Sequence, residues 1–333
     1  MSRVTLSHGD GGAFSAQLVQ NLFLRYLWNP YLEHLSDATI LPTPNRALAV
    51  TTDSFVVQPV FFPGGDIGKL SVCGTINDLT AGGARPLYLT AAFILEEGFL
   101  LSELEQIVAS MAQTAKECDV AVVAGDTKVV PRGQADGIYI NTTGIGQVHR
   151  GLKLSPREIK PGDAIIVSGT LGDHGIAVLS EREGLAFQTQ VKSDCAPLSS
   201  LLSAVEDLFP AVRWLRDPTR GGVAASLNEL AQAAGADIIL QERHLPIRPQ
   251  VKAAADMLGL DPLTLANEGK MVFVVQKDSA AELLSMLKAH PLGADAVIIG
   301  TVASGSGEVL MKTEAGGTRL VEMPAGIPVP RIC

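Results

Sequence analysis

The chain ends in Pro324-Ala325-Gly326-Ile327-Pro328-Val329-Pro330-Arg331-Ile332-Cys333, a stretch whose prolines restrict the secondary structure that it can adopt. Three prolines lie within seven residues of it, and each fixes φ and lacks an N–H, which argues against a helix or a central strand. We therefore expect the folded body to end before this stretch and the stretch itself to be an extended, mobile arm. Ten extended residues reach about 30 Å, enough to carry the thiol of Cys333 into a cleft elsewhere. The alternative is a frayed terminus that happens to end in cysteine.

The composition predicts a folded chain with room for two domains. The 333 residues are 47% hydrophobic and 18% charged, which excludes a disordered chain. The net charge of −9 and the absence of a cluster of Lys and Arg argue against nucleic acid as a partner. The longest apolar run, residues 87–95, is too short to span a bilayer, and the first ten residues hold no apolar signal core. We expect a soluble, cytoplasmic protein that binds neither nucleic acid nor membrane.

The other cysteines indicate packing rather than chemistry. Cys73, Cys118, Cys195 and Cys333 form no C-x-x-C pair, so neither a zinc site nor a disulfide framework is expected. Cys73 and Cys118 lie in apolar helical patterns and are predicted to be core residues. For Cys195 we also expect a structural role.

Two glycine-rich stretches in the first half are candidates for binding an anion. Gly9-Asp10-Gly11-Gly12 precedes an amphipathic stretch, residues 16–27, and a loop that enters a helix aims N–H groups at an anion. An ordinary flexible lead-in explains it equally well. The second stretch, residues 63–69, resembles a Walker A loop only superficially. Pro63 occupies the position of the first glycine, and Leu70 replaces the required Ser or Thr. Lys69 would either meet a phosphate or be solvated.

Three acidic residues accompany the predicted strands of the first half. Asp53 ends a predicted strand at residues 47–52, Asp78 lies in a predicted apolar helix, and Asp126 follows a predicted strand at residues 120–124. Oxygen ligands of this kind suit a Mg²⁺ ion that is shared with substrate phosphates. Each acid alone could instead be a cap or turn residue.

The second half continues with alternating strand and helix signals after a polar boundary near residues 157–162. Its first glycine loop, residues 169–175, has G-x-x-G-x-x-G spacing and not the dinucleotide-binding pattern. Asp217 and Thr219 open a helical pattern that runs to residue 234. They are either ordinary N-caps or a second anion site.

Several motifs follow one another in order along nearly the whole chain. They are His8-Gly9-Asp10-Gly11-Gly12, Thr52-Asp53-Ser54, Phe61-Phe62-Pro63-Gly64-Gly65, Asn77-Asp78-Leu79, Gly125-Asp126-Thr127-Lys128, Arg216-Asp217-Pro218-Thr219-Arg220-Gly221-Gly222, Asn267-Glu268-Gly269-Lys270 and Pro330-Arg331-Ile332-Cys333. Together they resemble the HypE family of hydrogenase maturation factors. The final tetrapeptide is the most specific of them.

The resemblance implies an α/β (α+β) fold of the aminoimidazole ribonucleotide synthetase-like superfamily. It implies an N-terminal ATP-binding and dimerisation domain at residues 1–155, a C-terminal α/β domain at residues 156–323 and a mobile tail at residues 324–333. It also implies a homodimer that binds ATP through acidic residues and Mg²⁺ instead of a P-loop.

The activity implied is that of an ATP-dependent carbamoyl dehydratase that acts on its own C-terminus. The carbamoyltransferase HypF would place a carbamoyl group on the thiol of Cys333. ATP would then phosphorylate the amide oxygen, because oxide is a poor leaving group, and loss of phosphate would leave a thiocyanate. The product would supply a cyanide ligand for the iron of [NiFe]-hydrogenase, through a HypC–HypD complex.

The resemblance also assigns roles to individual residues. Asp53, Asp78, Asp126 and Asp217 are the expected Mg²⁺ ligands, and Gly9, Asp10, Gly11, Gly12, Lys69, Asn77 and Thr219 the expected nucleotide-binding residues. Glu268 or Lys128 would be the base that removes the proton from nitrogen, and either could instead belong to a structural ion pair.

Two other functions remain open on the sequence. One is a kinase or synthetase of the same superfamily that acts on a free small molecule and has no use for the tail. Selenophosphate synthesis is disfavoured, because the N-terminal glycine loop carries neither Cys nor Lys. The other is a non-catalytic thiol carrier.

Overall fold

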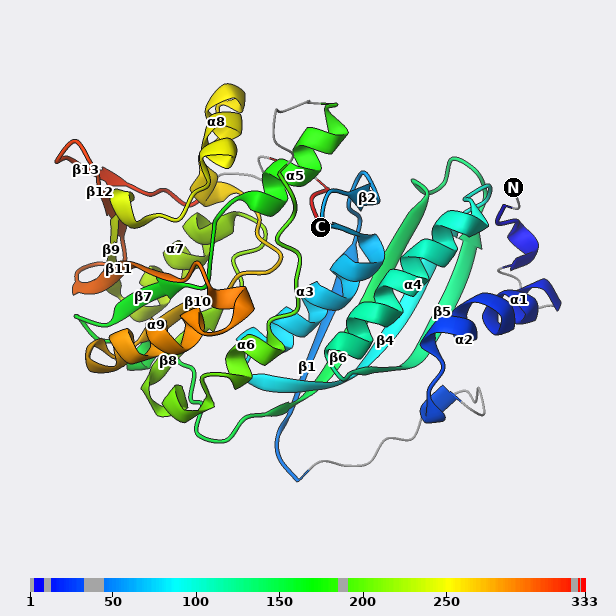
Figure 1. The fold of residues 1–333 in the computed structure, drawn as a ribbon, viewed down its shortest axis with the longest axis horizontal. Coiled ribbons are helices and arrows are strands. Elements are labelled where there is room, and N and C mark those ends of the chain that lie inside the picture. The colour runs from blue at the N-terminus through cyan, green and yellow to red at the C-terminus, as the bar shows by residue number, and fades with distance from the viewer. Residues whose placement is uncertain (1–2, 9–12, 33–44, 185–190, 325–328, 330) are drawn as a thin grey trace.

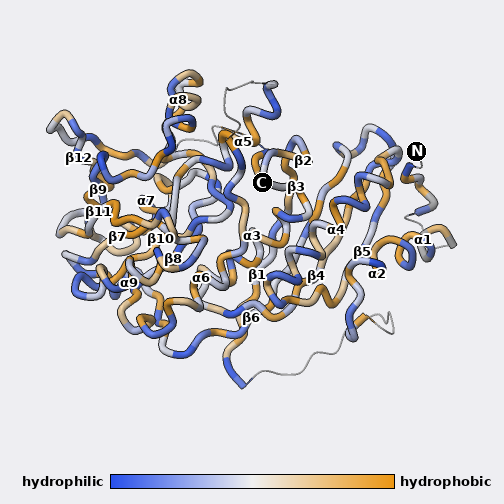
Figure 2. The backbone as a smooth tube through the Cα atoms, in the orientation of Figure 1, coloured by the Kyte–Doolittle hydropathy of each residue, from blue (hydrophilic) through white to orange (hydrophobic). Residues whose placement is uncertain are grey.

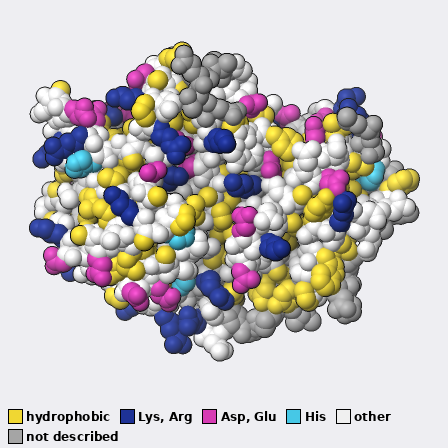
Figure 3. Space-filling view, in the orientation of Figure 1, with side chains coloured by type: hydrophobic (Ala, Val, Ile, Leu, Met, Phe, Trp, Pro, Cys, Tyr) yellow, Lys and Arg dark blue, Asp and Glu magenta, His cyan; other side chains and the backbone are white. Residues whose placement is uncertain are grey.

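The chain folds around two β-sheets, one from each half of the sequence, that lie beside one another (Figure 1). The computed structural model describes residues 3–8, 13–32, 45–184, 191–324, 329 and 331–333. Within these residues no helix is long and apolar enough to cross a membrane. On the face drawn in Figure 3, basic and acidic side chains are interspersed rather than separated into fields of one sign.

The N-terminal sheet has four strands and carries helices on one face. Its order is β1 (Leu48–Phe55), β6 (Ile138–Val148), β4 (Ala84–Glu96), β5 (Ala121–Val130), with only β4 and β5 parallel. The helices of this half are α1 (Ala13–Leu18), the π-helical η2 (Val19–Phe23), α2 (Leu24–Leu27), α3 (Ile67–Ala81) and α4 (Leu101–Glu117). Helices α3 and α4 lie side by side against the sheet, and the N-terminal helices continue the layer past α4 (Figure 1).

Helix α3 forms where the predicted helical pattern was and joins the sheet to the rest of the molecule. Asp66 caps it, because Oδ1 accepts hydrogen bonds from the backbone N–H of Gly68 (2.7 Å) and of Lys69 (3.2 Å). Gly68 lets α3 and α4 approach closely, since a Cβ there would lie 2.1 Å from the carbonyl oxygen of Ile107. The prediction that Cys73 belongs to the core is confirmed, since its side chain is fully buried on this helix.

Two predicted strand ends were wrong. Strand β1 continues through Asp53, and β5 continues through residues 125–128, although we expected these strands to end at residues 52 and 124. The reason in β5 is Gly125, which is paired with Ala91 of β4. A Cβ at Gly125 would lie 2.7 Å from the carbonyl oxygen of Ala91, so glycine here permits close strand approach instead of ending the strand.

The C-terminal sheet has seven strands and is covered on both faces. Its order is β13 (Thr318–Leu320), β12 (Val309–Lys312), β9 (Ala236–Gln241), β11 (Val297–Ser304), β7 (Ala164–Val167), β10 (Val272–Val275), β8 (Val212–Arg216). In β7, Ile165 and Val167 share a core with α7 (Gly222–Ala234), while Ile166 shares another with α9 (Ala280–Lys288). This alternation explains why the central strands read as continuous apolar runs. Figure 2 shows hydrophobic segments along the strands of both sheets.

The remaining elements are short or peripheral. They are α5 (Asp173–Arg182), α6 (Ser199–Ser203), α8 (Pro249–Leu258), β2 (Phe61–Phe62), β3 (Gly65–Asp66), η1 (Leu6–His8), η3 (Pro30–Leu32), η4 (Pro156–Glu158), η5 (Glu206–Ala211), η6 (Glu242–His244), η7 (Pro262–Thr264), η8 (Lys277–Ser279) and η9 (Pro291–Gly293). Strands β12 and β13 pair antiparallel as a hairpin.

The end of the chain lies between the two halves, near β2 (Figure 1). The carbonyl oxygens of Cys333 and Arg331 accept hydrogen bonds from the N–H groups of Val56 and Gln58, each at 3.2 Å. Val329 and Ile332 are each only 3% exposed. The sequence left open whether the arm rests inside or outside a cleft, and the structure places its end inside.

Candidate active site between the two domains

The thiol of Cys333 lies among charged side chains from both halves of the chain, and we call the site between these side chains the cleft. Burial raises the pKa of its thiol, the charge of Glu268 raises it further, and that of Arg220 opposes the shift. The carboxylates of Asp53 and Asp217 act on the same thiol more weakly. A thiol with a raised pKa is a poor nucleophile in its resting state, so the site favours chemistry on a group already attached to sulfur.

Three of the four predicted metal ligands meet in this cleft. Asp53 on β1 lies close enough to Asp78 on α3 for the two carboxyl groups to interact, and Asp78 Oδ2 accepts a hydrogen bond from the hydroxyl of Thr51 at 2.8 Å. Burial and then the charge of Asp78 raise the pKa of Asp53 to about 6. Burial, again followed by Asp78, raises the pKa of Asp217 to about 7. The three carboxyl groups thus repel one another when ionised.

The turn before α7 places Asp217 and Arg220. The N–H of Thr219 donates to the carbonyl oxygen of Asp217 at 3.0 Å. Gly222 then allows the helix to start, since its φ is +61° and a Cβ there would lie 2.4 Å from the carbonyl oxygen of Leu263. Replacing this glycine would therefore displace the whole acidic turn.

Glu268 is the most deeply buried acid of the cleft. It is 2% exposed, and its Oε1 has no hydrogen-bond partner within the described part of the chain. Burial raises its pKa well above the usual range, and the charges of Cys195 and Asp217 add to this. Its backbone is fixed by a hydrogen bond from its N–H to Asp194 Oδ1 at 3.1 Å. A buried carboxyl oxygen without a partner is costly, which points to a ligand on that side.

Asn77 connects the two domains. Its amide donates to the carbonyl oxygens of Ala196 (3.1 Å) and Glu268 (3.2 Å) and accepts from the N–H of Leu198 (2.8 Å). All of these groups lie on the C-terminal half, so Asn77 holds that half against α3. Its predicted contact with nucleotide stays a prediction.

The structure keeps Asp126 and Lys128 apart from the other acids. They form an ion pair of 2.8 Å on β5 with side chains that are 61% and 63% exposed, and the hydrogen bond from Lys128 lowers the pKa of Asp126. Asp126 is opposite Ala92, whereas the buried Ala91 is opposite Thr142 beneath α3. Asp126 therefore belongs to the face of the sheet that the helices leave open.

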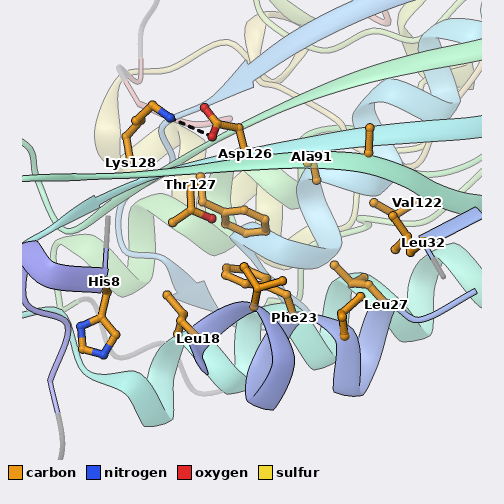
Figure 4. Close-up of a pocket in the computed structure, with 15 residues that line it drawn as sticks. His8, Leu18, Phe23, Leu27, Leu32, Ala91, Val122, Asp126, Thr127 and Lys128 are labelled. Carbon is orange, nitrogen blue, oxygen red and sulfur yellow. Dashed lines mark hydrogen bonds and ion pairs between the residues drawn. The ribbon is translucent and has the colours of Figure 1, made fainter. Parts of the chain in front are cut away.

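A second cavity of about 310 Å³ lies where β4 and β5 meet the N-terminal helices (Figure 4). Leu18, Phe23 and Leu27 form its apolar side, and β5 closes it on the other side, with the Asp126–Lys128 ion pair on the opposite face of that strand (Figure 4). His8 also lines it; the predicted phosphate loop, Gly9 to Gly12, follows His8 but lies outside the described residues. The predicted nucleotide and metal residues therefore fall into two groups, one here and one around Cys333.

Lys69 belongs to neither group. Its ammonium donates to the carbonyl oxygen of Gly64 at 3.1 Å, at the start of α3. Its predicted contact with a phosphate stays a prediction.

The residues of the cleft fit a divalent cation, although no three His, Cys, Asp or Glu side chains of the described chain form a preformed metal cage. The raised pKa values of Asp53 and Asp217 arise partly from neighbouring carboxylates, and a cation between these oxygens would relieve that repulsion.

Two residues of the cleft were not singled out on the sequence. Arg220 lies in the quoted stretch 216–222, and His174 in the glycine loop 169–175. The only signal in the sequence was that each residue lies in a glycine-rich loop. The sequence does not show which side chains the fold places next to Arg220 or His174.

Known proteins place the whole chain in one family. The N-terminal and C-terminal domain models of AIR synthase related protein match residues 35–148 and 160–312. The carbamoyl dehydratase HypE of Azotobacter vinelandii is 49% identical, over 99% of this chain and 97% of the relative. The chain belongs to the HypE carbamoyl dehydratase family.

Solved HypE structures have the same fold. A crystal structure of the hydrogenase maturation protein HypE in complex with ATP matches with a TM-score of 0.95 at 46% identity and covers 99% of each chain. A HypE–HypF complex matches with a TM-score of 0.82 at 49% identity, covering 94% of this chain and 100% of that one. The predicted family and the two-domain α/β fold are confirmed, whereas the roles of the individual residues and the boundaries at residues 155 and 323 stay predictions.

Proposed function

We propose that this chain uses ATP to dehydrate a carbamoyl group on its own Cys333, and so supplies a cyanide ligand for [NiFe]-hydrogenase. The observation that carries the proposal is the seat of the Cys333 thiol beside Glu268, in an acidic cleft between two domains. The ATP complex of a HypE relative supports ATP as the substrate. The HypE–HypF complex supports HypF as the enzyme that carbamoylates the thiol.

The reaction balances as S-carbamoyl-cysteine plus ATP giving S-cyano-cysteine, ADP and phosphate. The γ-phosphoryl group moves to the carbamoyl oxygen, the C–O bond then breaks, and phosphate leaves with its electron pair. The nitrogen gives up both of its protons as the C≡N bond forms. The chain therefore has to supply a proton acceptor close to Cys333.

Glu268 is our first candidate for that acceptor. A carboxylate whose pKa is raised by burial is a stronger base than one in water, and its Oε1 lacks a partner among the described residues. Lys128 is the second candidate. It lies on the open face of the N-terminal sheet, so it would need a second copy of the chain to reach a thiol.

Asp53, Asp78 and Asp217 would hold Mg²⁺, which when bound neutralises charge on the transferring phosphates. Arg220 adds a positive charge on the same side of the cleft. Asp126, Lys69, Asn77, Thr219 and the stretch from Gly9 to Gly12 remain candidates for further nucleotide or metal contacts.

We also propose a homodimer that forms through the open face of the N-terminal sheet and a HypC–HypD complex that receives the product. A terminal thiol that has to stay reduced between transfers fits a cytoplasmic location. The three-part division at residues 155 and 323 belongs to the same proposal.

The test is mass spectrometry of the C-terminal peptide. Full-length chain carbamoylated by HypF is incubated with Mg²⁺ and ATP, and we expect the peptide to lose the mass of one water. The Cys333→Ala variant serves as control and should show no substrate-dependent ATP turnover.

Two results would contradict the proposal. An unchanged peptide mass with ATP bound would favour the thiol carrier. Full ATP turnover by Cys333→Ala with a free small molecule would favour a kinase or synthetase.

A further inference from the structure

His174 contacts the tail directly and has no part in the chemistry proposed above. It lies in the first turn of α5, is fully buried, and its Nε2 is 2.8 Å from the carbonyl oxygen of Ile332. Its Nδ1 is 2.8 Å from the hydroxyl of Ser193, and its ring meets the ring of Phe62 edge-on at 5.4 Å. Both ring nitrogens are therefore engaged, one of them by the residue before Cys333.

These contacts fix one neutral tautomer. A carbonyl oxygen only accepts, so Nε2 carries the proton and Nδ1 accepts from the hydroxyl of Ser193. The same hydroxyl oxygen accepts from the N–H of Cys195 at 3.0 Å, which orients it. Burial lowers the pKa of His174, against the opposing charge of Asp194, and so favours the neutral form.

The backbone around His174 is tied to the segment that carries Glu268. The N–H of Gly172, just before α5, donates to Asn267 Oδ1 at 2.8 Å. Asn267 in turn donates from its amide nitrogen to the carbonyl oxygen of Pro218 at 3.0 Å, next to Asp217. These hydrogen bonds therefore hold the segments that carry His174, Glu268 and Asp217 in fixed positions relative to one another.

An apolar seat beside His174 receives the neighbouring tail side chains. Val329 and Ile332 border a small cavity with Gly175, Leu265 and Ala266. A Cβ on Gly175 would lie 3.1 Å from Leu265 Cβ, which is tighter than ordinary packing. The seat buries Val329 and Ile332, and the hydrogen bond from His174 acts together with those from Val56 and Gln58 to fix the position of the last residues.

We propose that His174 is a positioning residue, whose Nε2–H bond to the Ile332 carbonyl holds Cys333 and its carbamoyl group against Glu268. The biological role of this contact rests on the proposed function, whereas the alkylation test below does not require that function. The alternative is a core histidine that stabilises the fold and has no specific effect on the tail.

The test compares the alkylation rates of the four cysteines in the full, uncarbamoylated chain, with iodoacetamide as the probe and peptide mapping as the readout. Two variants of similar size separate the two cases: His174→Gln keeps an N–H donor near the position of Nε2, and His174→Met has none. In the Met variant the buried carbonyl oxygen of Ile332 loses its hydrogen-bond donor, which weakens docking of the tail. The alkylation rate of Cys333 should therefore rise about tenfold.

We expect the Met variant to raise the rate at Cys333 relative to Cys118, and the Gln variant to restore most of the protection. The matched control is His149→Met, because His149 packs against Phe209 away from the tail. An unchanged Cys333-to-Cys118 ratio in the Met variant would overturn the inference. So would equal acceleration of all four cysteines in both variants, since that indicates a structural role alone.

Carbamoylated protein gives an independent outcome. The Met variant should still accept the carbamoyl group from HypF but lose water more slowly with Mg²⁺ and ATP, and the Gln variant should recover the rate. If the wild type fails to lose water, the proposed function fails while the alkylation result still stands.

Discussion

At the scale of single residues, the cleft gathers more negative charge than its basic groups offset. Asp53, Asp78 and Asp217 come from three different elements, and Arg220 is the basic residue that acts on both Asp53 and Cys333. Such an arrangement costs free energy in the empty protein and favours a bound cation. The energetic cost and the binding site are therefore the same feature.

The first prediction concerns Asp217. Adding Mg²⁺ and ATP should raise the melting temperature of the wild type, since a ligand at one hundred times its Kd stabilises by about 2.7 kcal/mol. Asp217→Asn should lose most of this rise, measured by scanning calorimetry. Asp126→Asn is the matched control from the other group of candidates. A full rise in Asp217→Asn, with a loss in Asp126→Asn, would move the metal site to β5.

The second prediction concerns Glu268. Glu268→Gln keeps the shape but removes the base, so water loss from carbamoylated Cys333 should slow by about 10²- to 10⁴-fold. Because burial disfavours the charged carboxylate, the variant should melt no lower than the wild type. Quenched-flow mass spectrometry follows the first quantity and calorimetry the second. Wild-type rates of water loss would exclude Glu268 as the base.

The third prediction is a pH dependence of the tail seat. His174 faces Asp194, which pairs with Lys270 at 3.2 Å, and Asp173 lies next to it in the chain. The pKa of His174 in the folded protein is lowered from the usual value of 6.5. The stabilisation that neutral His174 provides is therefore complete above pH 6.5 and is lost as the pH falls through the folded pKa. Amide hydrogen exchange at Val56 and Gln58, corrected for intrinsic rates, should quicken on acidification. His174→Gln should lack this component, and an identical profile in that variant would contradict the assignment.

At the scale of elements, β5 shows where sequence reasoning stopped. Helical patterns predicted the helix that holds Asp78 and the one that ends at residue 234, which are α3 and α7. The face to which Asp126 points depends on strand pairing and on alternation, neither of which the sequence reveals. Asp53, Asp78 and Asp217, which the resemblance grouped together, lie near one another, whereas Asp126 lies on the open face; that any of them binds Mg²⁺ stays a prediction.

The tail is held at a second point besides His174. Arg331 has a left-handed φ of 53°, donates to the carbonyl oxygen of Val56 at 3.0 Å, and forms an ion pair with Asp136. Its own carbonyl oxygen accepts from Arg182 at 2.7 Å. These contacts of Arg331 are partly exposed to solvent, whereas the hydrogen bond between His174 and the Ile332 carbonyl is buried.

The fourth prediction separates these two contacts. An exposed ion pair contributes about 0–1 kcal/mol, so Asp136→Asn should raise Cys333 alkylation by less than about fivefold, a smaller effect than that of His174→Met. Raising the salt concentration should reduce the difference from the wild type. Asp126→Asn serves as control, because it removes another exposed acid of the same domain. A salt-independent effect would show that Asp136 acts by other means.

At the scale of the whole molecule, the N-terminal sheet has one face that no described helix covers. Val50 is 66% exposed on β1, and Ile94 is 42% exposed on β4. Both alternate with residues that face α3 or α4. An apolar sheet face of this kind favours association.

The fifth prediction is that Val50→Glu weakens the proposed homodimer. A charge in the middle of an apolar interface lacks a partner and costs several kcal/mol, so light scattering should report the monomer mass, with an unchanged circular dichroism spectrum. Thr313→Glu, on the far domain, is the control. An unchanged mass would place the interface elsewhere.

The resting place of the tail could not have been read from its composition. Three prolines predict an extended segment, but whether Ile332 and Val329 find an apolar seat depends on Leu265 and Ala266, which lie far from them in the sequence. The cleft itself depends on Asn77, whose three hydrogen bonds are invisible in a helical pattern. Contacts that join distant parts of the chain are the information that a single sequence lacks.

The seat and the segment that fills it belong to one polypeptide, so docking is a unimolecular equilibrium governed by effective concentration. Occupancy of the seat therefore does not depend on protein concentration, and a partner that binds the end of the chain competes with the tail's own contacts to His174, Val56 and Gln58.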